Sequence, residues 1–503
     1  MLEKIDLQKS VSKEEFKVVA KKLREQLSVL QQRVLKKKLP VIILFEGWGA
    51  AGKGELISDL ILNFDPRWCK VHSVTQPTKL ERRKPVLWRH WRNIPKAGDF
   101  SVLDRSWYMD VSTARLEENV SAEEIARRFD SINTFERELT DAGYLIIKFF
   151  VHISKKEQKK RFEKLEKDRN TQWRVTGQDW ERNRRYDEYL ESFDEMIGAT
   201  DTAAAPWHLL SGMDHRAAEL EVFKAVVLQV TKALEKTPAM ASAGEPIRPG
   251  VYPFLPMPKL SEVALNRTLD ENEYRRRLKE RQNQLRELHS ELYLKKIPVI
   301  LAFEGWDAAG KGGTIRRVAK ALDPRGYQVI PIAAPTPDEA ARHYLWRFWK
   351  RLPRDGHVAV FDRTWYGRVL VERVEGLCTE SDWRRAYREI NEFERELSDW
   401  GAVVLKFWLQ IDKDEQLLRF QARQNDPEKS WKITDEDWRN RSKWEQYEVC
   451  VNDMLRYTST RFAPWHIIES QNKMFGRVQT LDLIVSAIRE KCGEKRPHGK
   501  KED

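Results

Sequence analysis

Residues Val299 to Gly312 read VILAFEGWDAAGKG, and the same pattern stands at Val41 to Gly54 as VIILFEGWGAAGKG. In both stretches a run of apolar residues leads into Gly-x4-Gly-Lys, the spacing of a Walker A motif. A strand that ends in such a loop and is followed by a helix leaves several backbone N–H groups pointing at one place, where they attract phosphate. The sequence therefore predicts a phosphate-binding P-loop in two copies.

The repeat extends through most of the chain. Lys311 follows Lys53 by 258 residues. The same offset relates Asp362-Arg363 to Asp104-Arg105 and Ala463-Pro464-Trp465-His466 to Ala205-Pro206-Trp207-His208. This register indicates tandem duplication of a whole domain. Between the copies, a stretch rich in Pro, Ala, Ser and Gly has no periodicity. We predict an N-terminal domain at residues 1–236, a linker at 237–263 and a C-terminal domain at 264–503.

Within each copy, short apolar strands alternate with helical stretches. Ser12 and Asp270 each stand three residues before a glutamate, a capping-box pattern that precedes a long charged helix. In the second copy, the strand candidates after the phosphate-loop strand are residues 328–332, 357–361, 402–411 and 466–468. The alternation predicts α/β domains, each a doubly wound parallel five-stranded sheet with helices on both faces.

Composition narrows the class of protein. The 503 residues include 90 Lys and Arg against 78 Asp and Glu, a formal net charge of +12, which favours phosphates, nucleic acid or acidic lipid without choosing among them. The four cysteines lie far apart, with no CxxC and no metal-ligand spacing. The N-terminus lacks the apolar core of a secretory signal, and no apolar run approaches the roughly 18 residues of a membrane span. We expect a cytoplasmic protein with unpaired thiols.

The loop of the second copy has the residue types that phosphate binding requires. Gly305 and Gly310 permit a tight turn, Lys311 supplies a positive charge, and small residues let the backbone approach a phosphate closely. The predicted phosphate-binding set is Gly305, Ala308, Ala309, Gly310, Gly312, Gly313 and Thr314. Gly312 occupies the position at which a standard loop has the Ser or Thr that holds magnesium, so we expect metal ligands elsewhere.

Two acidic residues are candidate ligands for Mg²⁺. Asp362 follows the predicted strand at 357–361, at the sheet edge beside the loop, and Arg363 can neutralise oxygens of a transferred group. Asp307 lies inside the loop, where its charge would repel phosphate unless a cation or an acceptor proton lies between them. We assign it to magnesium or acceptor binding. Two alternatives stay open: Asp362 caps a helix and pairs with Arg363, and Asp307 forms a turn.

Further along, charged residues fall at helical spacing. Arg419 and Arg423 share one helical face, which belongs either to a solvated charged helix or to a basic lid that closes over the transferred phosphate. Arg368 and Glu372 are also four residues apart and either form an ion pair or contact a ligand. The tryptophans that recur in both copies, including Trp346, Trp349, Trp365, Trp431 and Trp465, are expected mostly in the core, as is His466.

Three stretches resemble the type-two polyphosphate kinase family: residues 305–313, residues 361–368 and the basic segment from Arg419 to Lys432. The resemblance occurs in both copies, and the two matches together cover nearly the whole chain. It implies a P-loop kinase fold with a helical lid, and it is closest to the two-domain members, which transfer a phosphoryl group from inorganic polyphosphate to AMP, giving ADP, with Mg²⁺. On this resemblance Asp307, Lys311, Asp362 and Arg363 are active-site residues, and Arg368, Glu372 and Arg423 are further candidates.

The two copies differ at the positions that matter for this chemistry. Asp307 corresponds to Gly49, Gly313-Thr314 to Glu55-Leu56, Arg368 to Asp110, Glu372 to Ala114 and Lys429 to Thr171. Losing a loop carboxylate and adding Glu55 near the phosphate site both disfavour binding of an anion with magnesium. We predict a catalytic C-terminal domain and a degenerate, chiefly structural N-terminal domain.

The expected partners are polyphosphate and AMP, with no nucleic acid, no membrane and a homodimeric assembly. The alternatives are an ATP-dependent nucleotide kinase, a polyphosphate kinase that acts on a nucleoside diphosphate, and a non-catalytic polyanion-binding protein.

Overall fold

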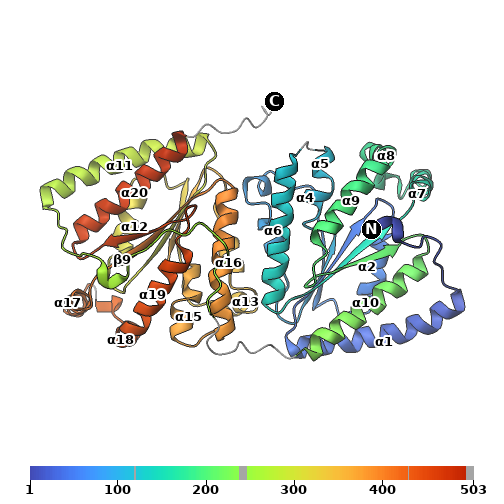
Figure 1. Ribbon diagram of the computed structural model, residues 1–503, viewed down its shortest axis with the longest axis horizontal. Helices are drawn as coiled ribbons and strands as arrows, with labels where there is room; N and C mark the ends of the chain where they lie inside the picture. The colour runs from blue at the N-terminus through green and yellow to red at the C-terminus, as the bar shows by residue number, and fades with distance from the viewer. Residues whose placement is uncertain (118–119, 237–245, 429, 494–503) are drawn as a thin grey trace. The chain divides into compact units, whose positions relative to one another are not determined.

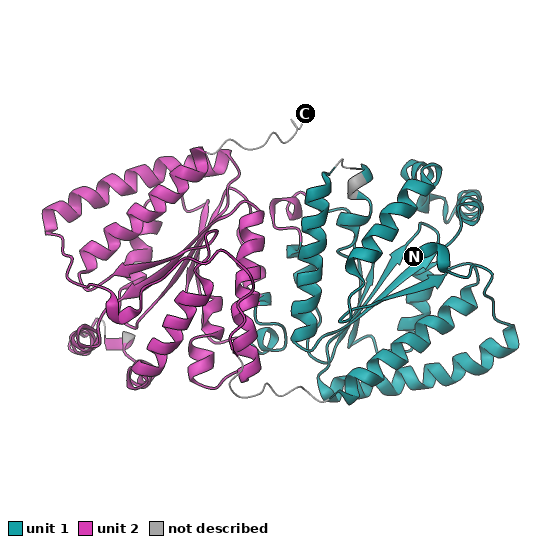
Figure 2. Ribbon diagram, viewed as in Figure 1, with its two compact units in different colours: residues 1–77, 87–239, 336–346 teal, residues 78–86, 240–335, 347–503 magenta. Residues whose placement is uncertain are grey.

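The computed structural model describes residues 1–117, 120–236, 246–428 and 430–493 (Figure 1). The chain forms two compact units (Figure 2). Unit 1 comprises residues 1–77, 87–239 and 336–346, and unit 2 comprises residues 78–86, 240–335 and 347–503. Each unit therefore includes a short segment from the other half of the sequence. The domain boundaries drawn at 236 and 264 stay a prediction.

Unit 2 is built on a parallel five-stranded sheet. Its strands are β6 (Val299–Gly305), β7 (Tyr327–Pro331), β8 (Val358–Asp362), β9 (Val403–Gln410) and β10 (Trp465–Glu469). They are ordered β10-β9-β6-β8-β7, and every neighbouring pair is parallel. All eight residues of β9 are buried, as expected for a sheet covered on both faces. The predicted α/β class and parallel five-stranded sheet are confirmed.

Helices cover both faces of this sheet (Figure 1). The helices are α11 (Glu271–Leu294), α12 (Lys311–Ala319), α14 (Trp346–Trp349), α15 (Val371–Val374), α16 (Glu380–Asp399), α17 (Lys413–Gln424), α18 (Asp435–Ser442), α19 (Trp444–Thr458) and α20 (Lys473–Gly493), with the 3-10 turn η5 (Trp365–Arg368). On one face α12 and α20 contact the strands and α11 packs on α20; on the other α16 contacts β9 and α19. Among the described residues, no helix is both long enough and apolar enough to cross a membrane.

Unit 1 repeats the arrangement. Its strands are β1 (Val41–Gly47), β2 (Cys69–Ser73), β3 (Phe100–Asp104), β4 (Leu145–His152) and β5 (Trp207–Ser211), in the parallel order β2-β3-β1-β4-β5. Its helices are α1 (Lys13–Lys37), α2 (Lys53–Ile61), α3 (Trp88–Trp91), α4 (Met109–Ser112), α5 (Ala114–Glu117), α6 (Ala122–Asp141), α7 (Lys155–Lys167), α8 (Gly177–Arg184), α9 (Tyr186–Thr200) and α10 (His215–Glu235), and α13 (Pro337–Ala340) also belongs to this unit.

The first helix of each copy begins where its cap residue predicts. The Ser12 hydroxyl accepts a hydrogen bond from the backbone N–H of Glu15 at 3.2 Å, before α1. The Asp270 carboxylate accepts one from the N–H of Glu273 at 3.0 Å, before α11. Both bonds satisfy donors that the first turn of a helix leaves without partners.

Part of the segment predicted as a linker is bound to unit 2. The backbone N–H of Leu255 donates to the carbonyl of Ser459 at 2.7 Å, and Phe254 forms a β-bridge with Thr460. Leu260 is buried, and its N–H donates to Asn452 at 2.9 Å. Residues 246–263 therefore form part of the folded unit, whereas residues 237–245 lie outside the described residues.

A buried ion pair ties the sheet of unit 2 to one of its helical layers. Lys406, on β9, is fully buried and its ammonium donates to Glu394 of α16 at 2.7 Å, to the Tyr366 hydroxyl at 2.8 Å and to the Thr458 carbonyl at 2.6 Å. Burial lowers the pKa of Lys406 to about 8 and raises that of Glu394. Unit 1 has the same network around Lys148 and Glu136, 2.8 Å apart. We call each of these networks the lysine hub.

The lysine hub generates a stability prediction. Glu394→Gln leaves the Lys406 ammonium buried without its counter-charge, so we expect it to destabilise unit 2 by about 3–5 kcal/mol. The matched control is Asp399→Asn on the same helix, which removes only an exposed ion pair with Arg395 and should cost at most about 1 kcal/mol. Urea denaturation followed by circular dichroism measures both. Equal midpoints for the two variants would contradict a structural role of the hub.

Candidate active site

The loop between β6 and α12 has positive φ angles, which glycine adopts more readily than other residues. Gly305 has φ of 149°, and a Cβ built on it would lie 2.7 Å from the carbonyl oxygen of Leu409. Ala308 and Gly310 also have positive φ, at 61° and 108°. These turns curve the loop into the first turn of α12, whose N–H groups have no intrahelical acceptors. The predicted phosphate-binding segment is therefore a strand–loop–helix turn with free N–H groups, and its binding of phosphate stays a prediction.

Lys311 lies across this loop. Its ammonium donates to the carbonyl of Gly305 at 2.5 Å and to that of Trp306 at 3.3 Å. In unit 1, Lys53 makes the corresponding bonds to Gly47 and Trp48 at 2.9 and 2.8 Å. The lysine thus places its positive charge against the loop in both units.

Arg363 brings a second positive charge to the loop from a strained position. It follows β8 directly and has φ of 63°, a left-handed conformation that is unfavourable for a residue with a side chain. Its N–H donates to the carbonyl of Phe303 on β6 at 3.1 Å. The guanidinium lies 3.6 Å from Asp307 and is half exposed. Although burial opposes it, Asp307 and other nearby carboxylates raise the pKa of Arg363.

Two residues, each from a different helix, hold Asp307 of the loop in place. The side-chain amide of Asn440, on α18, donates to its carboxylate at 3.0 Å. The amide of Gln416, on α17, donates to its backbone carbonyl at 3.1 Å. Asp362 ends β8 beside Arg363, and both carboxylates act on that guanidinium. Two aspartates near a phosphate loop supply the hard oxygen donors that Mg²⁺ prefers.

A pocket opens over the loop. It is lined by Glu304, Gly305, Trp306, Asp307, Lys311, Arg363, Gly367, Leu370, Val371, Trp408, Gln416, Glu436, Asn440, Trp444 and Tyr447. Asp362 is not among the lining residues. One wall is aromatic: Trp306 stacks on Trp444 with ring centroids 3.6 Å apart and meets Trp408 edge-on. A pocket with charged groups on one side and an apolar wall on the other suits a ligand that has both parts.

Glu304 lies beneath the loop, inside the protein. Its carboxylate accepts a hydrogen bond from the Thr364 hydroxyl at 2.8 Å. Burial raises its pKa, and Lys311 and Arg363 oppose the shift. Glu46 and Ser106 repeat this bond in unit 1 at 2.8 Å. The repetition in both units indicates a part in holding the loop and the turn after β8 together.

A group of cations gathers beside the start of α12. This basic cluster consists of Arg317, Arg419, Arg423, Lys473 and Arg477. Arg317 and Arg477 share the Tyr274 hydroxyl, at 3.2 and 3.5 Å. An Arg477 nitrogen lies 3.2 Å from a Cβ built at Gly313. Burial lowers the pKa of Lys473, and the three neighbouring arginines Arg419, Arg477 and Arg423 lower it further. Cations held this close to one another favour a polyanion.

The other candidates from the sequence have varied places. Arg368 and Glu372 form an ion pair at 3.1 Å and do not line the pocket. Thr314 is buried, and its hydroxyl donates to the Gly310 carbonyl at 3.3 Å. Arg423 belongs to the basic cluster, whereas Lys429 lies outside the described residues. The predicted catalytic and phosphate-binding roles stay predictions.

Arg419 holds the loop from behind. It is buried, and its guanidinium donates to the carbonyls of Ala308, Ser470 and Gln471 at 3.0, 2.7 and 2.9 Å. It is therefore neither a solvated surface residue nor a free lid charge, which were the two alternatives from the sequence. Of the five tryptophans expected mostly in the core, Trp346, Trp349, Trp365 and Trp465 are buried, and Trp431 is 73% exposed.

Four of the polar residues at the site that sequence reasoning missed are Gln416, Asn440, Lys473 and Arg477. The first two are neutral amides in charged helices, and nothing in their spacing marks them. The last two carried a usable signal, because the first copy has His215 and Glu219 at the same positions. A reversal of charge between duplicated domains would have indicated that this face binds different ligands in the two copies.

The corresponding pocket in unit 1 has different chemistry. It is lined by Glu46, Gly47, Trp48, Gly49, Arg105, Met109, Ser112, Thr113, Gln158, Phe162, Asp179, Arg182, Tyr189 and Phe193. Gly49 offers no carboxylate. Arg182 stands at the position of Asn440 and pairs with Glu117 at 2.7 Å. Met109 replaces Gly367, so a longer side chain projects at this point of the wall.

The chain is similar to known proteins in both sequence and structure. The chain matches the family described as Polyphosphate kinase 2 (PPK2) at residues 10–238 and again at residues 268–496. It is 40% identical to the polyphosphate:AMP phosphotransferase of Pseudomonas aeruginosa, over 97% of this chain and 98% of the relative. It is 35% identical to the polyphosphate:AMP phosphotransferase of Acinetobacter johnsonii, over 93% and 94%. A crystal structure assigned as a polyphosphate kinase 2 from Pseudomonas aeruginosa PA01 superposes with a TM-score of 0.87 at 38% identity, covering 99% of this chain and 100% of that chain.

The close approach at the loop gives a prediction about stability. Gly305→Ala forces a Cβ against the backbone of Leu409 in a conformation that disfavours any side chain, so we expect a loss of at least about 2 kcal/mol. Gly312→Ala, in the first turn of α12 with open space around it, should leave stability unchanged or raise it by up to about 1 kcal/mol. Thermal unfolding measures both, and a Gly305→Ala protein as stable as the wild type would show that the loop has another backbone conformation.

Proposed function

This chain belongs to the polyphosphate kinase 2 family, and we propose that it transfers the terminal phosphoryl group of inorganic polyphosphate to AMP, giving ADP. The observation that carries the proposal is the arrangement in unit 2, where a phosphate loop lies between a basic cluster and a partly aromatic pocket. One flank suits a pure polyanion, and the other suits a nucleotide. The names of the relatives from Pseudomonas aeruginosa and Acinetobacter johnsonii support the same reaction.

The basic cluster is the proposed donor site. Polyphosphate has neither a base nor a sugar, so its recognition depends on Lys, Arg and backbone N–H groups. Arg317 and Arg477 lie at Gly313, where α12 presents its N–H groups, and Lys473 and Arg423 lie beside them. Because Gly313 has no Cβ, the Arg477 guanidinium lies close to the first turn of α12.

The pocket over the loop is the proposed acceptor site. Its aromatic and aliphatic wall, formed by Trp306, Leu370 and Val371, offers apolar surface to a nucleoside. Arg363 and Lys311 line the same pocket and face the phosphate end. The phosphate of AMP is mostly ionised near neutral pH, because the second pKa of a phosphate ester is about 6. No general base is therefore required.

In the proposed reaction, an oxygen of the AMP phosphate attacks the terminal phosphorus of polyphosphate. The bond from that phosphorus to the bridging oxygen breaks, and the oxygen stays with the shortened chain. The loop N–H groups, Lys311 and Arg363 neutralise the charge that two polyanions bring together and hold them in line. Asp307 and Asp362 would hold Mg²⁺, which supplies further charge neutralisation at the phosphate oxygens when bound.

We assign this reaction to unit 2 alone. In unit 1, Gly49 provides no metal ligand, Arg182 replaces the amide that orients Asp307, and Glu55 adds a negative charge at the position of Gly313. Lys53 keeps its place against the loop, which fits a retained fold with altered chemistry. Unit 1 is then chiefly structural with respect to phosphoryl transfer.

The first test compares the two loop lysines. With polyphosphate, Mg²⁺ and AMP, the wild type should form ADP, separated by chromatography. Lys311→Ala should lower kcat at least about 100-fold, because the charge nearest the transferred group is lost. Lys53→Ala, the same substitution in unit 1, should retain most of the activity.

Parallel reactions with other phosphoryl donors and acceptors test the identity of both substrates. ATP in place of polyphosphate should give no comparable rate, and ADP, GMP or GDP in place of AMP should be poorer acceptors. Faster turnover with ATP would replace the proposed donor, and faster turnover of a diphosphate would replace the proposed acceptor. Loss of activity in Lys53→Ala with an active Lys311→Ala would assign the reaction to unit 1.

The second test concerns the basic cluster. Arg477→Gln should raise the KM for polyphosphate about tenfold or more, leave the KM for AMP nearly unchanged, and weaken the salt dependence of turnover, because one charge-assisted contact to the donor is lost. Arg489→Gln, an exposed arginine nearer the other end of α20, is the matched control. A rise in the KM for AMP alone would place the acceptor at this cluster instead.

A further inference from the structure

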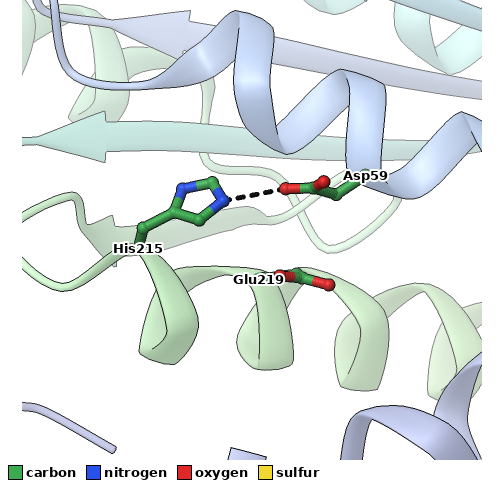
Figure 3. Close-up of side chains that lie close together, drawn as sticks. All are labelled: Asp59, His215 and Glu219. Carbon is green, nitrogen blue, oxygen red and sulfur yellow. Dashed lines mark hydrogen bonds and ion pairs between the residues drawn. The ribbon is translucent and has the colours of Figure 1, made fainter. Parts of the chain in front are cut away.

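Three side chains of metal-ligand type face one another in unit 1, outside the pocket of that unit. Figure 3 shows Asp59 on α2 opposite His215 and Glu219 on α10. One donor atom from each lies within 4.8 Å of the other two. Within the described residues, this is the one group of three or more His, Cys, Asp or Glu side chains that meets this spacing. None of the three takes part in the proposed reaction.

The local structure fixes this arrangement. His215 and Glu219 are four residues apart on α10, so both side chains project from the same face of the helix. Helices α2 and α10 pack together, and this contact brings Asp59 to that face. The Nε2 atom of His215 lies 2.8 Å from an Asp59 carboxylate oxygen. Two helices therefore supply one imidazole and two carboxylates to a single point.

The simpler explanation is that these side chains only satisfy one another. His215 and Asp59 share a hydrogen bond, and one oxygen of Glu219 accepts a hydrogen bond from Arg24 at 2.8 Å. Neither contact removes the capacity to bind a metal. A carboxylate has two oxygens, so Glu219 retains donor capacity while it is bonded to Arg24. Glu55, 3.8 Å from the Nδ1 atom of His215, adds a negative charge that offsets the charge of Arg24.

Comparison of the two units gives an independent reason to expect a cation here. In unit 2, the positions of Asp59, His215 and Glu219 are occupied by Arg317, Lys473 and Arg477, and the position of Glu55 by Gly313. Those residues are the part of the basic cluster beside the first turn of α12. At these three positions unit 1 has residues of metal-ligand type where unit 2 has cations. At the fourth position unit 1 has an acid where unit 2 has glycine. The same place on the fold thus favours an anion in unit 2 and a cation in unit 1.

We propose that Asp59, His215 and Glu219 bind a divalent transition metal ion such as Zn²⁺. An imidazole with two carboxylates favours Zn²⁺, Co²⁺ or Mn²⁺ over Mg²⁺ and Ca²⁺, which prefer all-oxygen sites. Ligand bonds of about 2.0–2.2 Å require donor atoms roughly 3–3.5 Å apart, so the three side chains need only small adjustments. His215 is exposed and can make them.

Binding also specifies the tautomer of His215. The metal takes the lone pair of Nε2 and displaces the hydrogen bond to Asp59, so the proton of the neutral ring resides on Nδ1. Glu55 faces that nitrogen and can accept its hydrogen bond, the usual arrangement behind a metal-bound imidazole. The bound ion would join α2 to α10 and stabilise unit 1. The site is therefore structural or regulatory, and it does not depend on the proposed phosphoryl transfer.

The test uses the full chain, purified without a histidine tag and freed of metal with a chelator. Titration with Co²⁺, read by its visible absorption, and with Zn²⁺, read by calorimetry, should show one site per chain and a rise in the melting temperature. His215→Ala should weaken Zn²⁺ binding at least about tenfold and abolish the Co²⁺ spectrum, and Glu219→Gln should weaken binding as well. The matched control, His72→Ala, removes a partly buried histidine elsewhere in unit 1 and should bind normally.

Two results would overturn the site. If the wild type and His215→Ala bind Zn²⁺ equally, the ion binds elsewhere, and if neither binds, the three residues only pair with one another. Glu55→Gln adds a finer measure, because it should lower affinity less than loss of a ligand does. None of these measurements uses turnover, so failure of the metal site and failure of the proposed reaction are distinguishable.

Discussion

The architecture of each unit depends on a lysine that has no access to water. In unit 2 the ammonium of Lys406 is bonded to α16 through Glu394, to the turn after β8 through Tyr366 and to the end of α19 through a carbonyl. A buried charge is costly unless nearly all of its hydrogen-bonding capacity is used, so these elements can occupy only one arrangement around it. The turn that Tyr366 belongs to begins with Asp362 and Arg363. The constraint at the hub therefore also sets where the charged groups of the pocket lie.

Strain at the pocket is tolerated because this framework surrounds it. Arg363 occupies a left-handed conformation that costs on the order of 1–3 kcal/mol, and the neighbouring Ala308 has a similar one. Arg419 bonds to the loop from behind, and Glu304 bonds from below to the turn that carries Arg363. Rigid support of this kind lets a loop present N–H groups and cations before any ligand arrives. A site that gathers two polyanions benefits from this, because its charges are already in place when the ligands repel each other.

Duplication has kept the framework and changed the chemistry. Both units have the lysine hub, the glycine at the strand end, the buried glutamate below the loop and the loop lysine in the same bonds. They differ around α2 and α12, where Arg317 and Arg477 of unit 2 correspond to Asp59 and Glu219 of unit 1. Positions of the hub resist change because each substitution leaves a buried neighbour unsatisfied, whereas half-buried charges such as Asp59 and Arg317 can be reversed at less cost in stability. The ligand preference of a unit can therefore change while its fold does not.

The sequence by itself determined the tandem, the parallel α/β sheets, the phosphate loop and the identity of the residues at the strand ends, because strands, glycines and caps are local signals with fixed spacing. It predicts Asp362 and Arg363 beside the loop, since the carboxyl ends of neighbouring parallel strands share one edge, and the Arg363 guanidinium lies 3.6 Å from Asp307 of the loop. Only the tertiary structure decided that Asn440 orients Asp307, that Arg419 is buried behind the loop, and that Arg477 stands beside Gly313. Each of these contacts joins residues more than 100 positions apart. Their partners are chosen by how the helices pack on the sheet, and no local pattern in the chain encodes that choice.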